Sequence, residues 1–182
     1  DNIIYVGTGE GFLRPGQKAK AQAGTGLYKL NGNTLVPVAG SAITGTVINR
    51  IACHPTNSNI IALATNLGVL ISTDGGTSFN AASVPNTTVN VTVGIDVKFN
   101  SAGILFFSIG NSEGTSSLAT VATKVYKSTD NTLSSFTNIT PVSAVLSDSN
   151  YGRIELAVSP SSPNVIYASC AKKYTNNSSA SL

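Results

Sequence analysis

The chain has 182 residues and a net charge of +3, and only 10% of its residues are charged, against about 25% in a typical soluble domain. Its 41% of hydrophobic residues is enough to build a core, which argues against a disordered chain. The 11 lysines and arginines are scattered rather than clustered with aromatic platforms, so nucleic acid is not expected as a partner. No run approaches the about 18 apolar residues of a membrane-spanning helix.

Short strands are predicted along the whole chain. Each is a run rich in Ile, Val, Leu, Tyr or Phe that is bounded by Gly, Asn, Pro or Ser. No stretch keeps apolar residues at helical spacing for three turns, so few helices are expected. In chain order the predicted strands lie within residues 2–9, 26–30, 49–55, 59–65, 68–73, 94–100, 103–110, 124–129, 153–160 and 164–171.

These strands recur as one repeated unit. Residues 50–65 and 153–169 both run as a strand, a turn of Pro, Ser and Asn, and a second strand, and residues 94–110 repeat the unit with a different turn. The strand after this turn recurs near residues 3, 60, 104 and 165, at spacings of about 57, 44 and 61 residues. A second unit follows at 26–30, 68–79 and 124–136.

A repeat of about 40–50 residues with four strands per unit is typical of β-propeller blades. The sequence therefore predicts an all-β fold, a partial β-propeller of about three four-stranded antiparallel blades in a single domain. The expected blade limits are 1–48, 49–92, 93–150 and a partial blade at 151–182. Because propellers close with about 4–8 blades, we expect the remaining blades to come from a longer chain.

Two of the units are lengthened between their second and third strands. The insertions are residues 10–25 and 111–123. Insertions at an equivalent position of a repeat fall on one face, which is the usual place for binding loops.

The segment 71–79, with the sequence ISTDGGTSF, joins a predicted strand to a turn. Gly75 and Gly76 permit positive φ, so the chain can reverse directly after Asp74. A carboxylate at the start of a turn accepts hydrogen bonds from backbone N–H groups a few residues further on. This spacing indicates that Asp74 braces a turn, although a catalytic role stays open at this point.

The same segment resembles the Asp-box, the Ser-x-Asp-x-Gly-x-Thr/Ser-Trp/Phe motif of BNR-repeat propellers. Ser72, Asp74, Gly76, Ser78 and Phe79 match it position by position. Families with this motif include sialidases, Vps10/sortilin ectodomains, xyloglucan-cleaving tandem-propeller glycoside hydrolases and many exported bacterial proteins. The resemblance implies that the box lies on the hairpin between the third and fourth strands of a blade, at the periphery, where its role is structural.

Residues 128–136 resemble a degenerate copy of the box. Ser128, Asp130 and Phe136 remain, but one residue is added and the glycine is lost. Only one strict copy is therefore present, while the repeat itself covers nearly the whole chain.

Carboxylates that could act on a glycan are scarce. A glycosidase needs two Asp or Glu residues that flank the sugar bond. Glu10 and Glu113 follow predicted strands at comparable places beside the two insertions, and they are the candidate catalytic pair; the alternative is that both are solvated loop acids. The catalytic motifs of xyloglucan-cleaving relatives are not found, and the arginines at 14, 50 and 153 make no evident sialidase triad.

Other chemistry-bearing residues point to structural roles or to ligand contact. His54 is the single histidine and precedes a proline in the repeated turn, so it is expected to be a turn residue rather than a general base. Cys53 and Cys170 show no metal-ligand spacing, so neither a metal nor a cofactor is expected, and whether the two cysteines pair stays open. Candidate ligand contacts are Phe12, Arg14 and Tyr151, with Phe12 and Tyr151 expected in loops.

The sequence favours a non-catalytic, secreted or cell-surface bacterial propeller module that binds or scaffolds a glycan or a protein. The low charge, the abundant Ser, Thr and Asn and the few cysteines fit an exported protein. The alternatives are a fragment of a glycan-degrading hydrolase of the xyloglucanase-like type and a sortilin-like receptor ectodomain.

Overall fold

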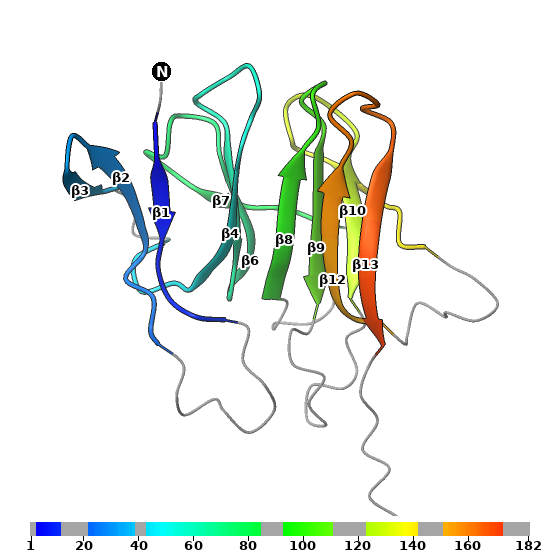
Figure 1. The fold of residues 1–182 in the computed structure, drawn as a ribbon, viewed down its shortest axis with the longest axis horizontal. Helices are drawn as coiled ribbons and strands as arrows, with labels where there is room; N and C mark the ends of the chain where they lie inside the picture. The colour runs from blue at the N-terminus through cyan, green and yellow to red at the C-terminus, as the bar shows by residue number, and fades with distance from the viewer. Residues whose placement is uncertain are drawn as a thin grey trace, which may run out of the picture.

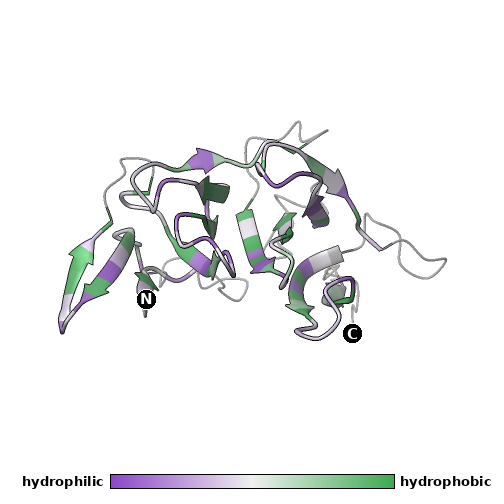
Figure 2. Cartoon of the chain, turned by 90° about the horizontal axis from the view of Figure 1, so that it is seen from above, coloured by the Kyte–Doolittle hydropathy of each residue, from purple (hydrophilic) through white to green (hydrophobic). Residues whose placement is uncertain are grey.

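The computed structural model describes residues 3–11, 22–38, 43–84, 93–110, 123–141 and 151–172. These ranges form four antiparallel β-sheets and contain no helix (Figure 1). Seen from above, the sheets stand side by side in an arc (Figure 2). Since no helix occurs in these ranges, none of them offers a helical membrane span.

The four sheets follow one another along the chain, with sequential strands as neighbours. The first contains β1 (Tyr5–Gly7), β2 (Leu27–Asn31) and β3 (Thr34–Pro37). The second contains β4 (Ile48–Cys53), β5 (Ile61–Thr65), β6 (Gly68–Ser72) and β7 (Asn80–Ala81). The third contains β8 (Val93–Phe99), β9 (Leu105–Gly110), β10 (Lys124–Ser128) and β11 (Phe136–Asn138), and the fourth contains β12 (Tyr151–Val158) and β13 (Ile166–Lys172).

This arrangement confirms the predicted fold class, an all-β partial propeller built of four-stranded antiparallel blades. Two sheets are complete, while the first has three described strands and the last has two. The blade limits at 1–48, 49–92, 93–150 and 151–182 stay a prediction.

The turn between the first and second strand of a sheet has the same hydrogen bond in three sheets. The N–H of His54 donates to the carbonyl of Ile60 at 3.0 Å, and the N–H of Asn100 donates to that of Ile104 at 3.0 Å. The N–H of Ser159 likewise donates to the carbonyl oxygen of Val165 at 3.2 Å. These bonds align the three sheets residue by residue.

The second strands of the two complete sheets, β5 and β9, are buried on both faces, because each lies between two neighbouring sheets. In β5, Ala62 and Ala64 face the third sheet, while Ile61 and Leu63 face the first. The third sheet adds Phe107 to the core, where its ring stacks on Tyr126 and meets Phe136 edge-on. Burial on both faces explains why these strands are continuous apolar runs rather than alternating ones.

Candidate functional site

Asp74 lies in the turn between β6 and β7, and its carboxylate holds that turn together. The hydroxyl of Ser72 donates to Oδ1 at 2.8 Å. The N–H of Ser78 donates to Oδ1 at 2.9 Å, and its hydroxyl donates to Oδ2 at 2.6 Å. These bonds, the Ser78 hydroxyl first, lower the pKa of Asp74 to about 2. A carboxyl group that is ionised in this way is poorly suited to donate a proton at neutral pH.

The two glycines that follow Asp74 dock this turn onto its surroundings. Gly75 has φ of +73° and donates its N–H to the carbonyl of Asn59 at 2.9 Å, so the turn lies beside the turn between β4 and β5. Gly76 has φ of +92° and donates to Ser72 Oγ at 2.8 Å. A Cβ on Gly76 would lie only 2.7 Å from Val38 Cγ1, so only glycine allows this close approach.

Asp130 makes the corresponding turn between β10 and β11 without the glycines. Its carboxylate accepts hydrogen bonds from the hydroxyls of Thr132, Ser134 and Ser135 and from the N–H groups of Thr132 and Ser134. The Ser135 hydroxyl is the largest cause of a pKa well below the usual range of an aspartate. The extra residue is accommodated by Leu133, which adopts φ of 57° and buries its side chain.

A buried carboxylate, Asp96, joins two sheets through their first strands. Its Oδ2 accepts the N–H of Leu156 on β12 at 2.8 Å. Its Oδ1 accepts the N–H of Val97 at 2.9 Å and the ammonium of Lys98 at 2.8 Å. The side chain is only 2% exposed, so these donors replace the water that the carboxylate loses on burial.

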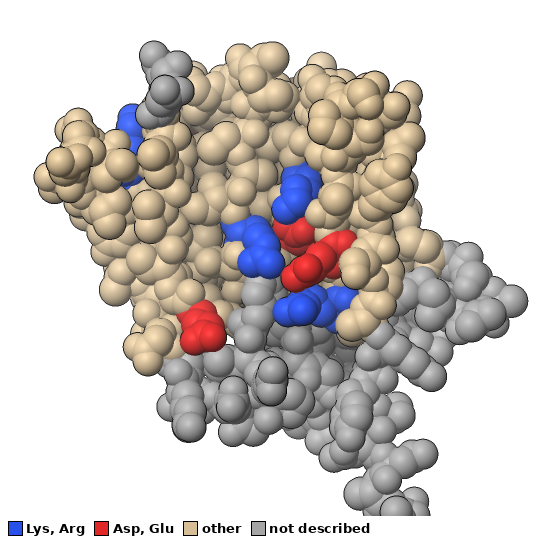
Figure 3. Space-filling view, viewed as in Figure 1, with Lys and Arg blue, Asp and Glu red and all other residues tan. Residues whose placement is uncertain are grey.

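Further charges gather on the same face, over the first strands β4, β8 and β12 (Figure 3). Glu155 Oε1 lies 3.3 Å from Arg50 Nη2 and 3.6 Å from Arg153 Nε. The sequence analysis did not identify these charged residues as neighbours. The turn alignment places Arg50, Asp96 and Glu155 at the same position of the first strands of three successive sheets. The hydrogen bonds of the turns, rather than the sequence, reveal this shared position.

The pairing of Glu10 with Glu113 as catalytic residues stays a prediction. Glu10 is exposed and follows β1, and its N–H donates to the carbonyl of Gln22 at 3.1 Å. Glu113 lies outside the described residues, as do Phe12 and Arg14. The carboxylate of Glu10 therefore has no described partner with which to flank a sugar bond.

The expectation that Tyr151 lies in a loop is wrong. Tyr151 is the first residue of β12 and pairs with Lys172 on β13. The ladder continues past a register shift between Tyr151 and Ile154, which is why the strand begins earlier than its apolar run.

His54 and the cysteines carry no arrangement for catalysis. His54 Nδ1 accepts the N–H groups of Thr56 and Asn57 at 3.3 and 3.2 Å, and its ring meets Phe99 edge-on, so it shapes its own turn. Cys53 and Cys170 are free thiols, and burial raises the pKa of each. Over the described part of the chain, no three His, Cys, Asp or Glu side chains group as metal ligands would.

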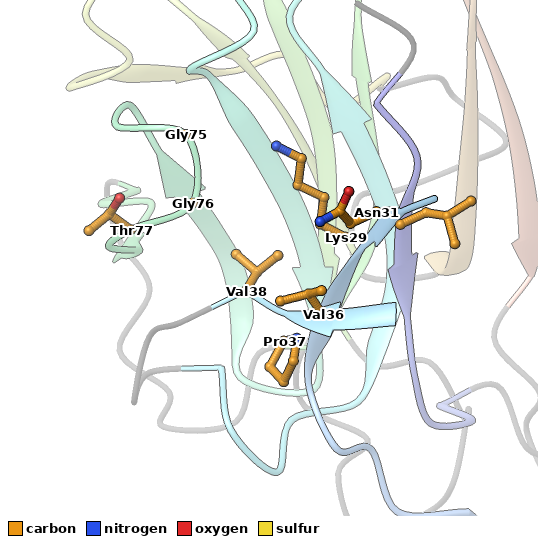
Figure 4. Close-up of a pocket in the computed structure, with 9 residues that line it drawn as sticks. Lys29, Asn31, Val36, Pro37, Val38, Gly75, Gly76 and Thr77 are labelled. Atoms are coloured by element: carbon orange, nitrogen blue, oxygen red, sulfur yellow. The ribbon is translucent and has the colours of Figure 1, made fainter. Parts of the chain in front are cut away.

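A recess of about 450 Å³ separates the β2–β3 hairpin from the turn of Asp74 (Figure 4). Its size falls in the range of small-ligand sites. Apolar Val36, Pro37 and Val38 form one side, and Lys29 is the one charged side chain of its lining. Gly75 and Gly76 of the turn line this recess, whereas the candidate catalytic residue Glu10 does not.

Similarity to known proteins is found in the fold and not in the sequence. No protein family and no curated protein matches the sequence. Among solved structures, the chain is similar to the GH74 xyloglucanase from Xanthomonas campestris, with a TM-score of 0.61 and 16% identity over 92% of this chain and 25% of that one. It is also similar to an ancestral GH74 enzyme, with a TM-score of 0.51 and 15% identity over 72% of this chain and 17% of that one.

These similarities show the fold alone, which is that of a β-propeller. The chain spans about a quarter of the length of the first enzyme and less of the second.

Proposed function

We propose that this chain is a segment of an exported β-propeller that binds or scaffolds a polysaccharide or another surface protein and does not itself catalyse a reaction. One observation carries the proposal: the carboxylates of Asp74, Asp96, Asp130 and Glu155 are each engaged in contacts within the protein. A glycosidase needs one carboxyl group with a raised pKa and a second that faces the sugar. The carboxylates that brace turns have lowered pKa values instead.

The binding surface that we propose lies at the end of the sheets opposite Asp74. Strands β1 and β9 both run toward this end (Figure 1), so the chain reaches the starts of residues 10–25 and 111–123 at the same end of the sheets. Phe12 and Arg14 belong to the first of these segments and are the proposed ligand contacts. We further propose that the protein is exported, as a secreted or a cell-surface bacterial protein.

The alternative is a fragment of a glycan-degrading hydrolase. The similarity to a xyloglucanase favours it, and Glu10 is exposed at the end of the sheets from which the insertions leave. In this case Glu10 and Glu113, or acids elsewhere in a longer chain, would supply the catalysis.

Binding and hydrolysis are separated by one experiment on the full chain and its Glu10→Gln variant. Both proteins are incubated with xyloglucan, other β-glucans and a glycan array, and retention and released reducing ends are measured. We expect retention without release, and no effect of Glu10→Gln on release. Release of reducing ends by the full chain that Glu10→Gln abolishes would establish the hydrolase instead.

A further inference from the structure

Lys29 on β2 and Ile71 on β6 occupy the same position in the first and second sheets. In each sheet a residue just after the outer strand, β3 or β7, donates its N–H to a carbonyl two residues before this position. The bonds run from Val38 to Leu27 at 2.9 Å and from Ala82 to Val69 at 2.8 Å. Since side chains two residues apart lie on one face of a strand, Lys29 and Ile71 both face the sheet that follows.

The surroundings of this shared position differ between the two sheets. Ile71 is 6% exposed and belongs to the core between the second and third sheets, as does Leu133 in the turn between β10 and β11, which is 7% exposed. Beside Lys29, the turn between β6 and β7 offers Gly76, which has no side chain, and the recess of about 450 Å³ is left open. A lysine in place of a core isoleucine gives up apolar burial, and such departures from regular packing are expected at functional sites.

The partner of this position on the outer strand differs in the complementary sense. Val36 of β3 lies opposite Lys29, whereas Asn80 of β7 lies opposite Ile71. Val36 is 44% exposed and forms part of the apolar wall of the recess. An apolar wall beside a single cation is the usual composition of a small-ligand site, in which a few polar groups fix the orientation of the ligand.

The recess offers a positive charge that has no counter-charge. Within the described part of the chain, neither the ammonium of Lys29 nor the side-chain amide of Asn31 has a hydrogen-bond partner. The Lys29 side chain leaves β2 toward the side of the recess on which Gly75 and Gly76 lie (Figure 4). None of the described lining residues is acidic, and Asp74 turns its carboxylate back onto the serines of its own turn. The site therefore suits a ligand with a negative charge.

We propose that this recess binds a carboxylate-bearing sugar, a uronate residue of a polysaccharide. The sugar carboxylate accepts a charge-assisted hydrogen bond from Lys29, and the amide of Asn31 pairs with sugar hydroxyls. The apolar face of the sugar ring packs on Val36 and Val38 and removes their surface from water. The choice of a sugar rests on the polysaccharide binding proposed above. The recess lies at the Asp74 end of the sheets, so it is a second site, opposite the first binding surface.

Digalacturonic acid is the probe for this site, and its dimethyl ester is the control that keeps the shape of the sugar without its charge. Calorimetric titration of the full chain measures the affinity, and NMR shifts of the backbone N–H groups locate the site. We expect saturable binding of the acid and about tenfold weaker binding of the ester, because the charge-assisted hydrogen bond is lost. The largest shifts should fall on Lys29, Asn31 and residues 75–77.

Substitutions of Lys29 test its role. We expect Lys29→Gln to weaken binding of the acid about tenfold. Lys127→Gln is the matched control and should leave binding unchanged, because Lys127 holds the same strand position in the third sheet but does not line the recess. Lys29→Ile copies the second sheet. It should abolish binding while the Tm of the free chain stays the same or rises, so lost binding is not mistaken for lost fold.

Four outcomes would overturn the proposal. These are no saturable binding of the acid, equal binding of acid and ester, equal effects of Lys29→Gln and Lys127→Gln, and binding of inorganic phosphate as tight as that of the acid. The last would make the recess an anion site without sugar recognition. Retention of uncharged xyloglucan is measured for the Lys29→Gln chain as well. It should be unchanged, so failure of this site is distinguishable from failure of the proposed function.

Discussion

The buried carboxylate of Asp96 on β8 accepts the backbone N–H of Leu156 on β12 at 2.8 Å, and this bond ties the first strands of two sheets together. The two residues are 60 positions apart in the chain. The bond fixes how one sheet sits against the next, because a backbone group can meet the carboxylate only in one register.

Replacing this carboxylate should destabilise the fold strongly. Asp96→Ala leaves the N–H of Leu156 and the ammonium of Lys98 without their acceptor, and we expect a loss of about 3 kcal/mol in the free energy of unfolding. Urea unfolding followed by circular dichroism measures it. Glu155→Gln is the control, since that side chain is 42% exposed and its ion pairs contribute less than about 1 kcal/mol. Equal losses for both variants would contradict the role assigned to Asp96.

Acidification should weaken the turn of Asp74 in a defined pH window. The folded pKa of about 2 lies below the ordinary value of 3.8, so the native state favours the ionised carboxylate. The stability that this group contributes is present above about pH 4 and is lost as the pH falls toward 2. Asp74→Asn should flatten the fall of stability with pH in this window. An unchanged pH dependence in that variant would show that the carboxylate does not hold the turn.

The turn position of His54 should accept asparagine. His54 Nδ1 accepts two backbone N–H groups, and at the equivalent position Asn100 Oδ1 accepts those of Ala102 and Ile104 at 3.1 and 2.9 Å. We expect His54→Asn to change the free energy of unfolding by less than about 1 kcal/mol and His54→Ala to reduce it by about 2 kcal/mol. Thermal and urea unfolding of the two variants provide the measurement, and equal losses would argue against an acceptor role.

Much of the fold was predictable because its signals are local. The apolar runs, the turn residues between them and the spacing of the copies lie within a few tens of residues, and the structure has strands at these places. The start of β12 was missed because Tyr151 joins the ladder across a register shift, which no apolar alternation announces.

The charged residues Arg50, Asp96 and Glu155 on the first strands could not be predicted from the sequence in the same way. Arg50 and Glu155 are 105 positions apart and meet only because the sheets pack around one another. Their shared repeat position becomes visible only once the strands are aligned through hydrogen bonds. Glu10 stands out in the sequence because it flanks an insertion, whereas Arg50, Asp96 and Glu155 lie inside ordinary strands.

The contact between Gly76 and Val38 gives a last test of how the turn of Asp74 docks on the first sheet. Gly76→Ala both strains a residue at φ of +92° and places its Cβ 2.7 Å from Val38 Cγ1. Gly32 is the matched control, because it has φ of +58° and a Cβ there would meet no atom within 4 Å. We expect Gly32→Ala to cost about 1 kcal/mol and Gly76→Ala about 2–3 kcal/mol in unfolding free energy. Adding Val38→Ala to Gly76→Ala should recover part of the difference, because it removes the methyl group that the new Cβ meets. If the double variant is no more stable than expected from the sum of its single changes, the two sheets do not meet at this contact.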